Sequence, residues 1–90
     1  MTALKTQSFF AVACLIENEV NYFTGFEFVF ENHPIRAIGW NDNPIYAILY
    51  TNRVSAEYSI QDILKYDPRT KAYITQVKIP FEAKNLKIVG

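Results

Sequence analysis

Residues 22–30, with the sequence YFTGFEFVF, show the clearest strand pattern in this chain. Side chains of a β-strand alternate between two faces, so residues two positions apart share a face. One face would carry Tyr22, Thr24, Phe26, Phe28 and Phe30, and the other Phe23, Gly25, Glu27 and Val29. Gly25 in mid-segment indicates a bulge or a close backbone approach. We therefore expect a strand over Tyr22–Phe30. Glu27 is its only charged residue that would disfavour pairing with another chain, so the strand should lie either inside a sheet or at a subunit contact.

Further segments rich in β-branched and aromatic residues, separated by polar turns, predict more strands. They are Ser8–Ile16, Ile35–Trp40, Ile45–Thr51, a strand from about Ala72 to Phe81, and Leu86–Val89. For the third of these an alternative exists, in which Asn43 caps a helix that begins at Pro44. The strand is favoured there because eight residues make a poor helix.

Two segments near the middle of the second half carry stronger local signals. Residues 59–62, SIQD, match the start of a capping box and precede apolar residues at helical spacing. They predict either a helix of about two turns or the outer part of a longer strand. Residues 66–73, YDPRTKAY, predict a β-hairpin, in which Asp67 and Pro68 form the turn. In it Tyr66 would face Tyr73 across the strands, and Lys71 would adopt a left-handed conformation.

The composition excludes several classes of protein. Half of the 90 residues are apolar and 16% are aromatic, which is unlike a disordered chain. A single cysteine excludes a disulfide scaffold, and the longest apolar run, of eight residues, is too short to span a membrane. We expect a single domain over residues 1–90 that is mainly β: a small antiparallel sheet, sandwich or barrel-like. An α+β fold with one short helix near residues 59–65 is the variant left open.

Few residues have the pattern of a catalytic or metal site. Cys14 lies in an apolar run, where its thiol pKa is expected to rise, and His33 is the only histidine. Glu31, His33 and Asp42 have no spacing that is diagnostic of a metal site. The apolar segment before Cys14 is also too short for a secretory signal. We therefore predict a cytoplasmic protein with no catalytic residues, no metal and no cofactor.

The charge distribution is uneven, although the net charge is zero. Residues 1–52 contain two basic and five acidic residues, a balance of −3, whereas residues 53–90 contain seven basic and four acidic, a balance of +3. The basic half supports one functional hypothesis, a single-stranded nucleic-acid binder in which cations contact phosphates and tyrosines stack on bases. Its candidate residues are Lys65, Tyr66, Arg69, Lys71, Tyr73 and Lys78.

The aromatic content supports the leading hypothesis. Seven Phe, six Tyr and one Trp exceed what a core of this size can hide, so some should form an exposed patch. We predict a non-catalytic protein-binding or adaptor module that acts through an aromatic-rich surface or a sheet edge. The candidates are Trp40, Tyr46 and Tyr50. The partner would be another protein or a second copy in a homo-oligomer, and not a membrane; Lys78 and Pro80 would protect the last long strand from edge pairing.

Overall fold

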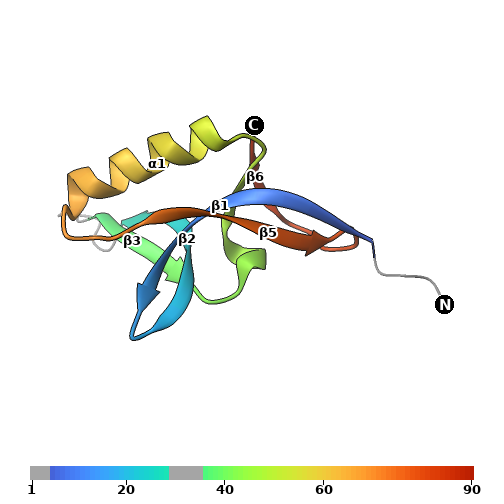
Figure 1. Cartoon of the computed structure of the whole chain (residues 1–90), viewed down its shortest axis with the longest axis horizontal. Helices are drawn as coiled ribbons and strands as arrows, with labels where there is room; N and C mark the ends of the chain where they lie inside the picture. Colours follow the sequence, from blue (N-terminus) through green and yellow to red (C-terminus); the bar gives the residue numbers. More distant parts are fainter. Residues whose placement is uncertain (1–4, 29–35) are drawn as a thin grey trace.

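A computed structural model describes residues 5–28 and 36–90, and Figure 1 shows a twisted sheet with one helix across it. The elements are β1 (Thr6–Ile16), β2 (Glu19–Phe28), β3 (Arg36–Asn41), the 3₁₀ helix η1 (Pro44–Tyr46), β4 (Ile48–Tyr50), α1 (Arg53–Tyr66), β5 (Tyr73–Pro80) and β6 (Lys87–Val89). The mainly β fold with one helix is confirmed, and it forms a small compact domain. Within the described ranges, no helix is both long and apolar enough to cross a membrane.

The longest strand, β1, is the centre of the sheet. It pairs antiparallel with β5 from Thr6 to Ala13, and with β2 from Ala13 to Ile16. On the β2 side it also pairs with β4, where Phe10 lies opposite Tyr50. β3 extends the sheet beyond β2, and β6 extends it beyond β4. The β4–β6 pair is parallel, so the sheet is mixed, although its other pairs are antiparallel as predicted. β2 lies between β1 and β3, which confirms its predicted interior position.

The helix is longer than the sequence pattern indicated. Its N-cap is Asn52, whose side chain accepts a hydrogen bond from the Ser55 backbone N–H at 2.9 Å. The capping box predicted at Ser59 is therefore wrong, as is the alternative of a strand over this segment. Residues 53–58 extend the helix because the Asn52 side chain accepts a hydrogen bond from one of its free N–H groups and Ala56 packs fully buried against the sheet.

The hairpin predicted over residues 66–73 is also wrong. Tyr66 is the last residue of α1, Tyr73 is the first of β5, and β5 pairs with β1 instead. The turn itself is confirmed, since the Asp67 carboxylate accepts a hydrogen bond from the Arg69 N–H at 3.1 Å. Lys71 does not adopt the left-handed conformation. Among the described non-glycine residues, only Glu17, Asn18 and Asn85 have a positive φ.

The boundaries of the strands predicted over Tyr22–Phe30 and Ile45–Thr51 shift. Residues 17 and 18 have φ of 51° and 67° and join β1 to β2 as a two-residue turn, so β2 begins at Glu19. Its predicted end, Val29–Phe30, lies outside the described residues. The Asn43–Pro44 alternative is right for Pro44–Tyr46, where the Asn43 side chain accepts from the Ile45 N–H at 3.1 Å, and only Ile48–Tyr50 remains as strand.

Both faces of the sheet carry a buried cluster. The helix-side cluster, beneath α1, consists of Val12, Phe23, Tyr50, Ala56 and Ile63. The loop-side cluster, on the opposite face, consists of Phe9, Ala11, Ala47, Leu49, Val77 and Ile79. The latter is covered by the chain around η1 and by Ala83 and Leu86 from the β5–β6 segment. Successive residues of β1 thus enter different clusters, which explains why its sequence is apolar on both faces.

The bulge predicted at Gly25 is confirmed and involves a second glycine. The β2–β3 register shifts between Phe23 and Gly25, and Gly25, at φ 121°, lies opposite Gly39. A Cβ at Gly39 would clash with the Thr24 hydroxyl and lie 3.1 Å from the Gly25 carbonyl oxygen. Glycine is therefore required here by the close approach of two strands.

We expect Gly39→Ala to lower the free energy of unfolding by roughly 1–3 kcal/mol, because the added methyl group overpacks this crossing. A double variant that also carries Thr24→Ala lacks the hydroxyl oxygen nearest to the added methyl group, so it should recover part of the lost stability. Urea denaturation of both variants and of Thr24→Ala alone measures the coupling. Additive losses in the double variant would contradict the proposed clash.

Candidate functional site

A row of apolar side chains lies uncovered at the end of the sheet that carries the β1–β2 turn. The register places Leu15 opposite Val20, and it places Ala13 between Tyr22 on β2 and Tyr73 on β5. Paired residues and residues two apart share a face, so these side chains lie together on the face opposite α1. We call Leu15, Val20, Tyr22 and Tyr73 the hairpin patch.

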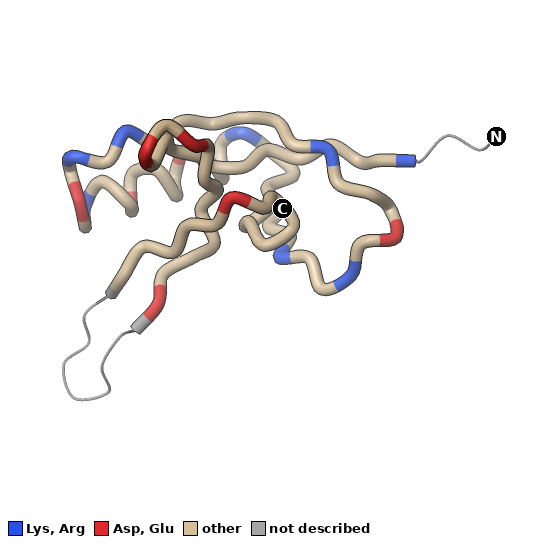
Figure 2. Tube along the Cα trace, turned by 90° about the horizontal axis from the view of Figure 1, so that it is seen from below, with Lys and Arg blue, Asp and Glu red and all other residues tan. Residues whose placement is uncertain are grey.

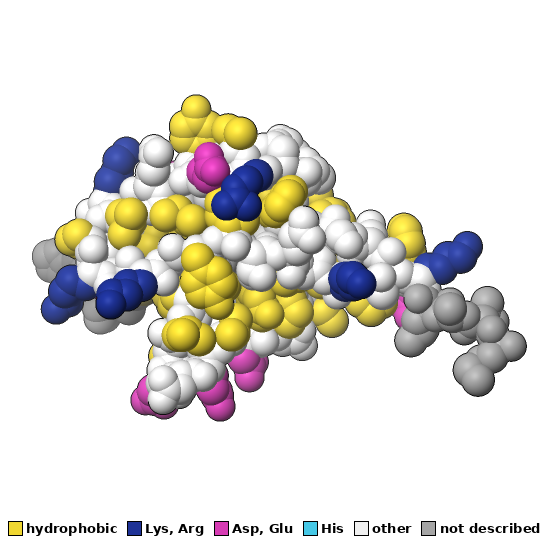
Figure 3. Space-filling model, viewed as in Figure 1, with side chains coloured by type: hydrophobic (Ala, Val, Ile, Leu, Met, Phe, Trp, Pro, Cys, Tyr) yellow, Lys and Arg dark blue, Asp and Glu magenta, His cyan; other side chains and the backbone are white. Residues whose placement is uncertain are grey.

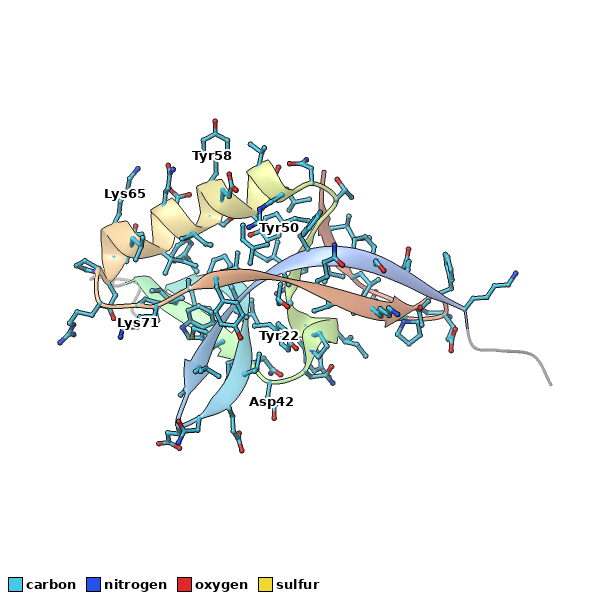
Figure 4. The ribbon with its side chains drawn as sticks, viewed as in Figure 1. Tyr22, Asp42, Tyr50, Tyr58, Lys65 and Lys71 are labelled. Carbon is cyan, nitrogen blue, oxygen red and sulfur yellow. The ribbon has the colours of Figure 1, made fainter. Side chains whose placement is uncertain are left out.

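The hairpin patch is exposed because the elements that cover this face end before reaching it. η1 and the β5–β6 segment protect the part of the face formed by Phe9, Ala11 and their neighbours. None of the elements in residues 5–28 and 36–90 extends this cover beyond Ala13, and Leu15 is 62% exposed, with Val20 and Tyr73 each at 40%. Tyr22 is half-buried and points from β2 toward η1 (Figure 4). Figure 3 shows hydrophobic side chains gathered between β5 and the hairpin end of the molecule.

Opposite charges lie at different sides of the hairpin patch. The β1–β2 turn carries the exposed acidic residues Glu17 and Glu19 next to Leu15 and Val20. Basic residues gather where α1 meets β5, the corner that is blue at the left of Figure 2. Lys71 is exposed at this corner, two residues before Tyr73 (Figure 4). The patch is thus an apolar surface with an acidic side and a basic side.

The three residues predicted for partner binding lie in different environments. Tyr50 is 2% exposed and belongs to the helix-side cluster, where its hydroxyl donates to the Ser59 oxygen at 2.6 Å. It is a core residue, which corrects its assignment to a binding surface. Trp40 packs edge-on against Phe23, with ring centroids 5.9 Å apart, and closes the rim of the same cluster. Tyr46, on η1, is 57% exposed and remains at the surface.

The six residues predicted for nucleic-acid binding are not brought together. Lys65, Tyr66, Arg69, Lys71 and Tyr73 lie near the α1–β5 corner, but Lys78 is five residues further along β5, about 17 Å away. Lys65 pairs with Asp62 at 3.8 Å and Arg69 with Asp67 at 3.4 Å.

The two tyrosines of this set lie on opposite sides of the sheet. The Tyr66 ring packs on Phe26, with centroids 5.1 Å apart, at the margin of the helix-side cluster. Tyr73 lies on the other face, beside Ala13. They do not form the shared stacking surface that the hairpin prediction implied.

The candidate catalytic groups have little chemical support. Cys14 is buried, and burial raises the pKa of its thiol, as expected from its apolar surroundings. His33 and Glu31 lie outside the described residues. Within residues 5–28 and 36–90, no three metal-ligating side chains form a cluster. A shallow hollow on the outer face of α1 is lined by Val54, Glu57, Tyr58 and Gln61, with one carboxylate and no opposing group.

Comparisons with known protein families, with curated protein sequences and with solved structures find no match to this chain. The candidate site is therefore defined by its own geometry. Leu15 and Val20 were absent from the sequence-based candidates, although one signal pointed to them. A two-residue turn at Glu17-Asn18 would have placed Leu15 opposite Val20.

The Tyr50–Ser59 hydrogen bond generates a stability prediction. Tyr50→Phe should lower the free energy of unfolding at neutral pH by about 0.5–1.5 kcal/mol, because the hydrogen bond to Ser59 is lost. Thermal and urea denaturation measure the loss, and Ser59→Ala should give a similar one.

Wild type and Tyr50→Phe should also differ in how their stability depends on pH. Burial is the largest effect and raises the pKa of Tyr50. The hydrogen bond with Ser59 lowers this pKa by less, and the charge of Asp62 adds the smallest contribution, which raises it. Above about pH 10 the unfolded chain loses the Tyr50 proton while the folded protein retains it, so wild-type stability falls as pH rises toward the folded pKa. Tyr50→Phe lacks this contribution, so the stability difference between the two proteins should narrow above pH 10. A constant difference would contradict the burial effect.

Proposed function

We propose that this protein is a small non-catalytic protein-binding module, an adaptor that engages its partner through the hairpin patch. The observation that carries the proposal is the exposed Leu15–Val20 pair flanked by Tyr22 and Tyr73. Apolar surface of this kind, grouped on one face and bordered by charge, is typical of protein interaction sites. Tyrosine side chains add large contact area at low entropic cost.

The chemistry of the patch favours a protein over a nucleic acid. Leu15 and Val20 are aliphatic and offer no flat surface for a base, and the nearest charges at the turn, Glu17 and Glu19, repel phosphate. The cations at the α1–β5 corner are partly neutralised by Asp62 and Asp67. We therefore expect a partner with an apolar centre and with basic side chains that face the β1–β2 turn.

Leu15→Lys tests the proposal. It places a charge in the centre of the hairpin patch and should reduce partner capture at least about tenfold, because the lysine interrupts the apolar surface and its ammonium group loses water when the partner covers it. The fold should be retained, since Leu15 is largely exposed. The measurement is affinity capture from host lysate with nuclease treatment, quantified by mass spectrometry.

Val54→Lys is the matched control, because it makes the same change at an exposed apolar residue on the outer face of α1. Capture of the same protein by wild type and Val54→Lys, but not by Leu15→Lys, supports the hairpin patch as the binding surface. Equal capture by all three proteins would contradict it. Captured material that disappears on nuclease treatment would instead support nucleic-acid binding.

A further inference from the structure

One edge of β5 is unpaired along its length in the part of the chain that the structure describes. The strand pairs with β1 on one side, and among the described residues no strand pairs with its other side. Gln76 and Lys78, which lie along this edge, are exposed. An open strand edge presents backbone N–H and C=O groups that can pair with another strand.

The direction of each backbone group on β5 follows from one hydrogen bond. The Phe81 N–H donates to the Lys5 carbonyl oxygen at 3.1 Å, one step beyond the β1–β5 ladder in the same register. Hydrogen-bonded pairs alternate along an antiparallel ladder, so the odd-numbered residues 73–79 bond to β1. The N–H and C=O groups of Ile74, Gln76 and Lys78 therefore point outward. Pro80 also lies at an outward position, where its missing N–H leaves the β1 ladder intact.

This edge is complementary to a second copy of itself. Outward groups must pair with outward groups, so an antiparallel pairing of two β5 strands joins even-numbered residues. With Gln76 opposite its own copy on a two-fold axis, Ile74 lies opposite Lys78 on both sides of that axis. The two lysines are then apart, and Pro80 falls beyond the paired residues, so the protection against edge pairing expected from Lys78 and Pro80 does not block this register. On the other face the same register brings Tyr73 opposite Ile79, which extends the apolar surface.

Charge supports the same register. Lys71 and Glu82 are both exposed and lie just beyond opposite ends of β5. Antiparallel pairing about Gln76 brings Lys71 of one copy to the end that carries Glu82 of the other, on both sides of the axis. Opposite charges therefore meet at each end, whereas a parallel arrangement would place like charges together.

We propose that two copies of this chain associate through their β5 edges, in antiparallel register about Gln76, to form one continuous sheet. The surface is distinct from the Leu15–Val20 part of the hairpin patch, so the dimer does not depend on the proposed adaptor function. A single strand pair buries less than the roughly 800 Å² per partner of a standard stable interface. The dimer is therefore weak and depends on protein concentration.

Cysteine crosslinking tests the register. Cα atoms of a hydrogen-bonded antiparallel pair lie about 5.5 Å apart, within disulfide range, so Gln76→Cys should form a covalent dimer under mild oxidation. Lys78→Cys is the matched control, because the register separates the two Lys78 positions by about 13 Å. Wild type, whose Cys14 is buried, gives the background. Dimer formation by Lys78→Cys as fast as by Gln76→Cys would overturn the register.

Charge reversal tests the contact at the strand ends in solution. Lys71→Glu and Glu82→Lys should each raise the dimer Kd roughly three- to tenfold in sedimentation equilibrium, and the double variant should recover wild-type affinity. Leu15→Lys should leave the dimer unchanged, so a failed adaptor test and a failed dimer test are distinguishable. A wild-type protein that stays monomeric at millimolar concentration, or a double variant that remains as weak as the single variants, would overturn the proposal.

Discussion

The burial of β1 on both faces is the constraint on which the rest of the structure depends. Ala11, Val12 and Ala13 have no exposed surface, so both sides of this strand must be covered by other parts of the chain. The helix covers one side, and η1 with the β5–β6 segment covers the other. A chain of 90 residues has little material for two layers of cover, because small domains bury a limited fraction of their surface.

The hairpin patch is exposed because this short chain has too few residues to cover both faces of the sheet completely. The β1–β2 ribbon continues past the last residue that η1 and the β5–β6 segment reach, so the apolar side chains of Leu15 and Val20 are exposed and no described element packs over them. The edge of β5 has a similar origin, since β1 is the only described partner of that strand. Both proposed contact surfaces are thus parts of a small sheet that no other described element covers or pairs with. Leu15 and Val20 lie on the β1–β2 hairpin, whereas the proposed dimer contact lies along the outer edge of β5.

The sequence predicted those features of the strands that depend only on neighbouring residues. The strand that contains Tyr22, the bulge at Gly25 and the short strand near Leu86–Val89 are all present, because local composition and glycine reflect backbone geometry directly. The predicted alternation after Tyr22 is wrong beyond the bulge, which places Phe26 beside Phe23 in the helix-side cluster while Tyr22 packs against the loop-side cluster. The errors arose where one local signal fits two structures. Asp67-Pro68 makes the same turn after a helix as after a strand, so it could not reveal that Tyr66 ends α1. Asn52 was overlooked as a cap because the residues after it lack a strong apolar period.

The sequence by itself determined the class of this protein: a small, mainly β domain, rich in aromatic residues, with opposite charge in its two halves. Composition and alternation are properties of the chain, and they need no knowledge of which strands meet. Only the tertiary structure decided which aromatic side chains are exposed. Tyr50 and Tyr73 look alike in sequence, yet one lies beneath α1 and the other at an open end of the sheet. Exposure depends on what the rest of the chain places over a residue, and that cover comes from segments distant in sequence.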